Sequence, residues 1–75
     1  MRALSELRPG ARAEVLAVTG ESGLVQRLHE FGLFEGEEIE VLAIAPLGDP
    51  IEIRLGNTRL SLRKSEAAGV SVRPF

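Results

Sequence analysis

His29 is the only histidine in this chain of 75 residues, so it is the first residue to consider for acid–base chemistry or for binding a transition metal. Transition-metal sites usually take three or four nitrogen or sulfur ligands, and the sequence contains no cysteine. At helical spacing His29 lies beside Val25, at the border of an apolar face. We therefore interpret His29 as a boundary residue of a helix and not as a metal ligand.

A second candidate is the densest acidic group, which comprises Glu35, Glu37, Glu38 and Glu40. Hard cations prefer carboxylate ligands, so this group could bind a divalent cation weakly. In a strand, however, Glu38 and Glu40 share one face and Glu37 does not, and the spacing of an EF-hand loop is absent. The sequence favours a solvated turn over a metal site, and we predict no metal ligand and no cofactor.

Asp49, between Gly48 and Pro50, is the third candidate, as a catalytic acid. No base or nucleophile accompanies it at a recognisable spacing, and aspartate before proline is common in turns. The sequence also lacks a phosphate-binding glycine loop, a nucleophile elbow and a metalloprotease motif. We predict that the protein is not an enzyme.

The last candidate is an apolar stripe at helical spacing, formed by Leu24, Leu28, Phe31 and Leu33, which could contact a partner protein. Such a stripe more often belongs to a core. We expect Phe34, just after the helix, to be exposed instead. A large exposed aromatic side chain usually marks a contact surface, so Phe34 is the residue to test.

The clearest of the elements that position these residues is a hairpin. Gly56 and Asn57 form a two-residue connection that tolerates positive φ, as the primed turns of tight hairpins require. With that turn, the apolar residues of strands 51–55 and 58–62 share one face. The expected pairs are Leu55 with Thr58, Ile53 with Leu60, and Ile51 with Leu62. A shift by one residue would bury the charged side chains, so the turn and the pattern predict the same register.

The other elements follow from hydrophobic periodicity. They are a helical turn around Leu4 and Leu7, strands over residues 11–18 and 38–45, a helix from Ser22 to about Phe31, a helical turn over residues 63–68 before Gly69, and a last strand at residues 70–72. This order predicts one mainly β domain over residues 1–75, in which a bent sheet of about five strands closes on itself.

The helix has sequence signals at both ends. Ser22 is the expected N-cap. Gly32 takes the left-handed C′ position, and Leu33 then contacts Leu28 in a Schellman ending. The two long strands break their alternation near their ends, where we expect a second apolar face. The residues of that face are Leu16, Val18, Leu42 and Ile44.

Composition narrows the class of function. The net charge of −2, the pI near 5.3 and the absence of Trp and Tyr argue against a nucleic-acid binder. No apolar run approaches the roughly 18 residues of a membrane span, and the first ten residues lack the apolar centre of a signal peptide. We expect a cytoplasmic protein that is not embedded in a membrane.

Three segments together resemble the pattern of ferrous iron transport protein A, the FeoA family. They are Arg27 to Leu33 with Gly36, Ala45 to Ile51, and Leu62 to Ala67, and the resemblance extends from Leu4 to Val72. It implies a small SH3-like barrel with one α-helix inserted after the first strand and a short helical turn before the last. It also implies a cytosolic accessory protein of bacterial ferrous iron uptake, which contacts the cytosolic part of a GTP-binding, FeoB-like membrane transporter.

Carried over by position, the resemblance names candidate partner-binding residues in the helix motif and in the loop after the second long strand. They are Arg27, Leu28, Phe31, Gly32 and Leu33, to which we add the exposed Phe34, and Pro46, Leu47, Gly48, Asp49 and Pro50. Phe31 stands where the family more often has Leu or Met. The two prolines restrict the loop and so reduce the entropy that it would lose on binding.

Two other functions stay open at this stage. The resembling domain type also occurs at the C-terminus of iron- and manganese-dependent repressors, so a small transition-metal-binding sensor or carrier is one alternative. A free-standing SH3-like module for another partner, such as an RNA-associated complex, is the other. The sequence leaves the docking face and the oligomeric state undetermined.

Overall fold

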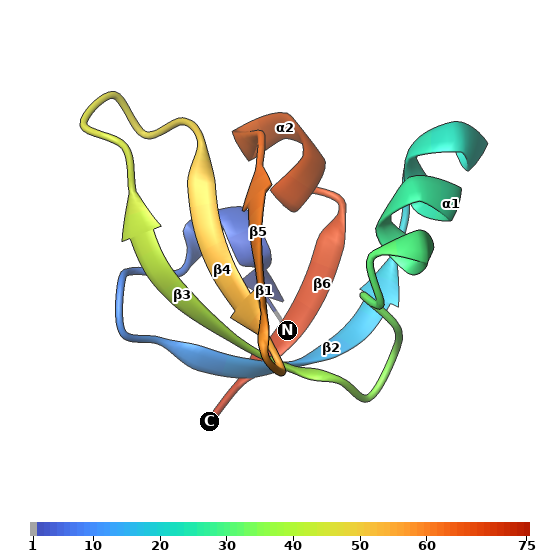
Figure 1. The fold of residues 1–75 in the computed structure, drawn as a ribbon, viewed down its shortest axis with the longest axis horizontal. Coiled ribbons are helices and arrows are strands. Elements are labelled where there is room, and N and C mark those ends of the chain that lie inside the picture. Colours follow the sequence, from blue (N-terminus) through green and yellow to red (C-terminus); the bar gives the residue numbers. More distant parts are fainter. Residues whose placement is uncertain (1) are drawn as a thin grey trace.

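The computed structural model describes residues 2–75, and Figure 1 shows how its strands and helices are arranged. The elements in chain order are β1 (Arg2–Ala3), a 3₁₀ turn (Leu4–Glu6), β2 (Arg12–Val18), α1 (Ser22–Glu30), β3 (Glu38–Ile44), β4 (Ile51–Leu55), β5 (Thr58–Leu62), α2 (Lys64–Ala67) and β6 (Val70–Pro74). The mainly β fold, with α1 after the first long strand and α2 before the last strand, is as the sequence predicted. The two-residue strand β1 is one more than the five expected.

The hairpin of β4 and β5 has the predicted register, in which Leu55 lies opposite Thr58, Ile53 opposite Leu60 and Ile51 opposite Leu62. Gly56 has φ +60°, and within residues 2–75 no residue other than glycine has positive φ. Positive φ at the first central residue alone defines a type II′ turn, whose twist matches that of the strands.

Each of the two long strands contains a β-bulge, and this corrects the predicted second apolar face. The pairing of β2 with β6 shifts register between Val15 and Ala17, and the pairing of β3 with β4 shifts between Val41 and Ala43. An extra residue in one strand reverses the alternation beyond it. Val18 and Ile44 therefore pack against the core instead of facing away from it.

The core is formed by side chains from every strand except β1, together with the N-terminal turn and both helices. All buried residues of the described chain are apolar, and the largest fully buried ones include Leu4, Leu28, Leu33, Ile51 and Ile53. Leu7 is also buried, so the N-terminal segment covers the core as expected. No buried side-chain nitrogen or oxygen of residues 2–75 lacks a hydrogen-bond partner.

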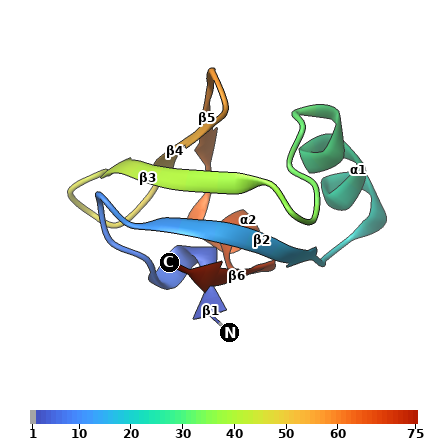
Figure 2. The same ribbon diagram turned by 90° about the horizontal axis from the view of Figure 1, so that it is seen from below.

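The sheet is strongly bent, but its two end strands do not meet. The strands are paired in the order β1-β6-β2-β3-β4-β5, so β1 and β5 are both edge strands. Viewed from below, the β4–β5 hairpin stands at one end of the sheet, and β6 and β1 at the other (Figure 2). The predicted closure of the sheet on itself, which would have removed both edges, is therefore not formed by hydrogen bonds between described strands.

Gly69, which follows α2, is required by a close approach of two backbones. Its carbonyl accepts hydrogen bonds from the backbone N–H of Thr19 at 2.8 Å and from the Thr19 hydroxyl at 3.0 Å. A Cβ added at position 69 would lie 2.3 Å from the carbonyl oxygen of Thr19. A side chain at this position would therefore push apart the segments that join β2 to α1 and α2 to β6.

We predict that Gly69→Ala lowers the free energy of unfolding by about 1–3 kcal/mol, as for other overpacked sites, measured by urea unfolding. Gly23→Ala in α1 is the matched control. An added Cβ there meets nothing within 4 Å, and alanine favours helix, so this variant should be neutral or more stable by up to about 1 kcal/mol. Equal destabilisation by the two substitutions would contradict the role assigned to Gly69.

Candidate functional site

The C-terminal end of α1 has the predicted Schellman geometry. Gly32, with φ +96°, follows the C-cap residue Phe31. The N–H of Gly32 donates to the carbonyl of His29 at 2.9 Å, and the N–H of Leu33 donates to the carbonyl of Leu28 at 3.0 Å. These are the two hydrogen bonds that define the motif. The helix therefore stops at a fixed place and turns the chain sharply before Phe34.

The N-terminal end of α1 differs from the prediction. The N-cap residue is Glu21, and no side chain accepts a hydrogen bond from the first turn of the helix. Ser22 is instead the first helical residue and is exposed. The capping motif expected from Ser22 is therefore absent, and the helix is fixed mainly by packing of its apolar side chains and by its C-terminal end.

The exposed side of α1 carries a shallow groove, which we call the α1 groove. It is lined by Ser22, Val25, Gln26, His29, Glu30 and Phe34. The rings of His29 and Phe34 stack with their centres 4.8 Å apart and an angle of 14° between their planes. Phe34 is 48% exposed, as the sequence predicted, and Phe31, which is not among the lining residues, is equally exposed. Aromatic rings with this much free surface suit contact with another molecule.

Two of the predicted contact residues cannot contribute to such a surface. Leu28 and Leu33 are both 0% exposed and belong to the core. Sequence reasoning could not separate them from Phe31, because all three belong to one apolar stripe at helical spacing. In the structure Leu28 and Leu33 are buried, whereas Phe31 and Phe34 are half exposed, so of these four residues the two Phe present apolar surface outward.

Arg27 has a different role, which the sequence analysis missed. Its guanidinium forms an ion pair with Glu66 of α2, and Glu66 also accepts a hydrogen bond from the backbone N–H of Arg63 at 2.9 Å. The only signal in the sequence is that Glu66 follows Arg63 by three residues, a spacing typical of a carboxylate that caps the start of a helix. Arg27 thereby links α1 to α2.

The loop from Pro46 to Pro50 is the second predicted contact segment. Gly48 has φ +88° and donates from its N–H to the carbonyl of Ala45 at 2.7 Å. Leu47 at its tip is 96% exposed. Asp49 contacts α2, because its Oδ1 accepts a hydrogen bond from the N–H of Lys64 at 3.0 Å, at the start of that helix.

The structure does not bring the two predicted contact segments together. The loop lies at the left in both views and α1 at the right (Figures 1 and 2). They are two separate surfaces on opposite sides of the molecule, and a single small partner domain would contact one of them.

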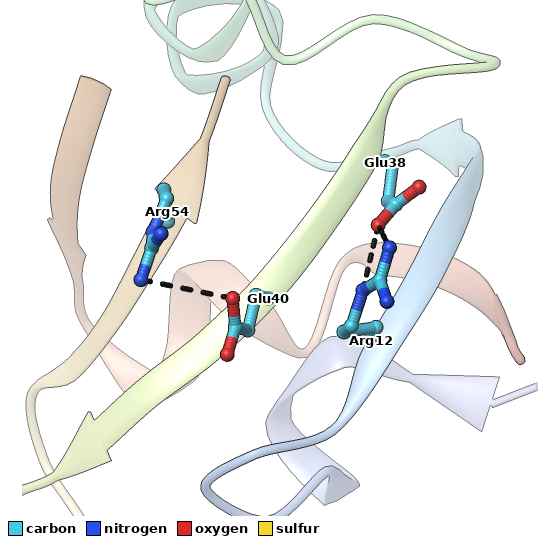
Figure 3. Close-up of polar contacts among 4 residues, drawn as sticks. All are labelled: Arg12, Glu38, Glu40 and Arg54. Carbon is cyan, nitrogen blue, oxygen red and sulfur yellow. Dashed lines mark hydrogen bonds and ion pairs between the residues drawn. The ribbon is translucent and has the colours of Figure 1, made fainter. Parts of the chain in front are cut away.

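Two residues of the acidic group, Glu38 and Glu40, form ion pairs on the outer face of the sheet. Glu38 lies directly opposite Glu14 but accepts a hydrogen bond from Arg12 Nε at 2.8 Å, while Glu14 pairs with Arg73. Glu40 lies 3.7 Å from Arg54 of the next strand. Figure 3 shows the first and last of these pairs side by side across three strands. The hydrogen bond that Arg12 donates to Glu38, and then the negative charge of Glu38, raise the pKa of Arg12.

A family model of the FeoA domain matches residues 2–74. The chain belongs to the FeoA family. A fusion of Fe(2+) transport protein A with Fe(2+) transporter FeoB from Porphyromonas gingivalis is 38% identical over 69 residues, which are 92% of this chain and 8% of that protein. This chain thus corresponds to a small part of that relative.

Solved FeoA proteins share the fold. The FeoA protein of Chlorobium tepidum is 46% identical, with a TM-score of 0.89 over 93% of this chain and 67% of that one. The FeoA of Stenotrophomonas maltophilia, described as an SH3 domain protein complexed with zinc, is 36% identical, with a TM-score of 0.85 over 97% of this chain and 91% of that one. The SH3-like fold expected from the resemblance is confirmed.

The same fold occurs in a larger regulator. A manganese-dependent transcriptional repressor matches 99% of this chain and 41% of its own, with a TM-score of 0.92 at 17% identity. At that identity the likeness concerns the fold alone, since one fold serves many functions.

Two further findings bear on what this FeoA-family chain can do. Within residues 2–75, no three His, Cys, Asp or Glu side chains are grouped so that they could hold a metal ion. None of the helices in this range combines the length and the apolar character needed to cross a bilayer.

We predict that Asp49→Ala lowers the free energy of unfolding by about 1 kcal/mol, the usual cost of removing a side-chain cap from a helix start. Asp49→Asn keeps the acceptor oxygen, so its free energy of unfolding should fall by clearly less than that of Asp49→Ala. Thermal unfolding of both variants tests this. If the Ala and Asn variants lose the same stability, the hydrogen bond that Asp49 accepts from the Lys64 N–H does not contribute to folding.

Proposed function

We propose that this FeoA-family protein is a non-enzymatic cytoplasmic accessory protein of bacterial ferrous iron uptake. It docks on the cytosolic part of a GTP-binding ferrous iron transporter and modulates that transporter by contact. The relative from Porphyromonas gingivalis supports the pairing, because it joins transport protein A and FeoB in one polypeptide. The Stenotrophomonas maltophilia protein has been suggested to act as a ferrous iron transport activating factor.

The observation that carries the docking proposal is the α1 groove with its exposed aromatic residues. Phe34, one of three Phe in the chain, lines the groove and is 48% exposed, and Phe31, directly before Gly32, is equally exposed. Aromatic side chains often dominate binding energy when a partner covers them. The groove is also rigidly positioned, since the Schellman hydrogen bonds and the buried Leu28 and Leu33 fix the end of the helix.

The alternative surface is the loop from Pro46 to Pro50. It offers one exposed apolar side chain, Leu47, on a turn that is fixed by internal hydrogen bonds. The α1 groove offers two stacked rings and Val25 around a concave surface. We therefore assign the transporter contact to the α1 groove.

The experiment is an NMR titration of the labelled protein with the cytosolic GTP-binding domain of the ferrous iron transporter from the same cell. We predict that shifts map to Arg27–Phe34 and that Phe34→Ser weakens binding by tenfold or more, the loss expected for an aromatic hot spot. Leu47→Ser is the matched control. It also removes an exposed apolar side chain, but on the opposite side, and should leave the affinity unchanged.

If Leu47→Ser weakens binding and Phe34→Ser does not, the contact lies on the loop from Pro46 to Pro50 instead. If the labelled wild-type protein shows no shifts at high micromolar concentrations of the GTP-binding domain, docking on this domain is contradicted. Phe34 is half exposed, so its replacement should leave the fold intact, which one-dimensional spectra of the free variant check directly.

The metal sensor or carrier remains the second candidate, because the Stenotrophomonas maltophilia relative is described with zinc. The donor chemistry of residues 2–75 does not favour it here, since no group of three candidate ligands is brought together. We predict that calorimetric titration with Fe(II) or Zn(II) shows no micromolar site. A micromolar site that is lost in His29→Ala would favour the sensor or carrier instead.

A further inference from the structure

Strand β5 is an edge strand whose outer hydrogen-bonding groups are unpaired. It pairs with β4 alone. In a hairpin with a two-residue turn, Leu55 and Thr58 form a hydrogen-bonded pair, and such pairs alternate along the ladder. The N–H and C=O groups of Arg59 and Ser61 therefore point away from β4. No other hydrogen bond among residues 2–75 reaches them.

The solvent side of this edge is positively charged. Arg59 and Ser61 are exposed on the outer face of β5, and Arg63, which follows the strand as the N-cap of α2, is exposed as well. Arg59 lies directly opposite Arg54, and like charges in that position repel each other. None of the ion pairs formed by residues 2–75 includes Arg59 or Arg63.

Acidic groups near the edge offset this charge only in part. Glu40 pairs with Arg54 at 3.7 Å, and Glu52 lies opposite Ser61. Glu66 accepts from the Arg63 N–H but pairs with Arg27. Residues 51–63 contain three arginines and one glutamate, hence a charge of +2, in a chain whose net charge is −2. The hairpin is therefore a basic region of an acidic protein.

A second copy of this chain is a poor occupant for the edge. Two β5 strands side by side would join two hairpins of charge +2 and leave their arginines close together. Arginine and lysine on edge strands are a known means of preventing such self-pairing. An acidic strand has the opposite effect, because its carboxylates would lie beside Arg59 and Arg63.

We propose that β5 is a docking strand for an extended acidic segment of a partner protein, which adds to the sheet by β-augmentation. The backbone groups of Arg59 and Ser61 bind the added strand, and acidic side chains on its outer face pair with Arg59 and Arg63. The residues between them face inward, beside Leu60 and Leu62, and are apolar. The segment recognised thus alternates acidic and apolar residues.

The probe is a six-residue synthetic peptide of alternating Glu and Val, added to the labelled full-length protein. We predict that the amide resonances of Arg59 and Ser61 shift and exchange more slowly with solvent. The matched peptide of alternating Lys and Val should cause no shifts. Arg59→Glu should weaken binding of the acidic peptide by about fivefold to tenfold, as expected when attractive cross-strand pairs become repulsive.

Ser61→Pro supplies an independent test of the backbone contact. Proline removes the Ser61 N–H, which points away from β4, so the hairpin ladder keeps its hydrogen bonds. The variant should no longer bind the peptide, while the amide resonances of the other strands stay where they are in the wild-type protein. If the proline variant does not fold, the slowed solvent exchange of the Arg59 and Ser61 amides on peptide binding tests the backbone contact instead.

Three results would overturn the proposal: no shifts at millimolar acidic peptide, equal shifts with the Lys peptide, or shifts that map to α1 instead of β5. Concentration-dependent shifts at Arg59 and Ser61 without peptide would overturn it in favour of a second copy as the occupant. This test contains no transporter domain and concerns a different surface from the α1 groove. Its outcome is therefore independent of the proposed function.

Discussion

The two β-bulges in β2 and β3 are the constraint on which the shape of this molecule depends. Each of these seven-residue strands pairs with a different neighbour on either side, and the pairing with one of those neighbours shifts by one residue near the strand end. A bulge bends its strand and reverses which face the following side chains occupy. Without the shift, Val18 and Ile44 would face water and the apolar layer would end early. With it, one sheet of short strands encloses a core on its concave side.

The outer side of the same sheet is organised by charge. Glu14 and Glu38 face each other across β2 and β3, an unfavourable arrangement that is relieved because each pairs with an arginine elsewhere, Arg73 and Arg12. Glu40 pairs with Arg54 in turn. Two of the four acidic residues that suggested a cation site, Glu38 and Glu40, thus link neighbouring strands. Charge is left unbalanced at the β5 edge, where Arg59 forms no ion pair with any of residues 2–75.

Sequence family and surface geometry contribute different parts of the functional argument. The family links this chain to ferrous iron transport, and a relative joins the domain to the transporter itself. The fold by itself does not indicate a particular function, since a manganese-dependent repressor contains the same architecture. The functional argument rests instead on the surface, where His29 and Phe34 stack beside α1 and β5 leaves an open basic strand edge. Both are features suited to contact with another molecule.

The sequence by itself determined two features whose cause is local, the β4–β5 hairpin and the C-terminal end of α1, although it misplaced the N-cap of that helix. The hairpin register followed from Gly56 and the alternating residues around it, and the end of α1 followed from Gly32, because turn chemistry and helix termination depend on a few adjacent residues. Other features were decided by the tertiary structure alone. They are the two bulges, the open β5 edge, the burial of Leu28 and Leu33 while Phe31 is exposed, and the contact of Asp49 with Lys64. Each depends on which distant strand or helix lies alongside, and spacing within one segment carries no information about that.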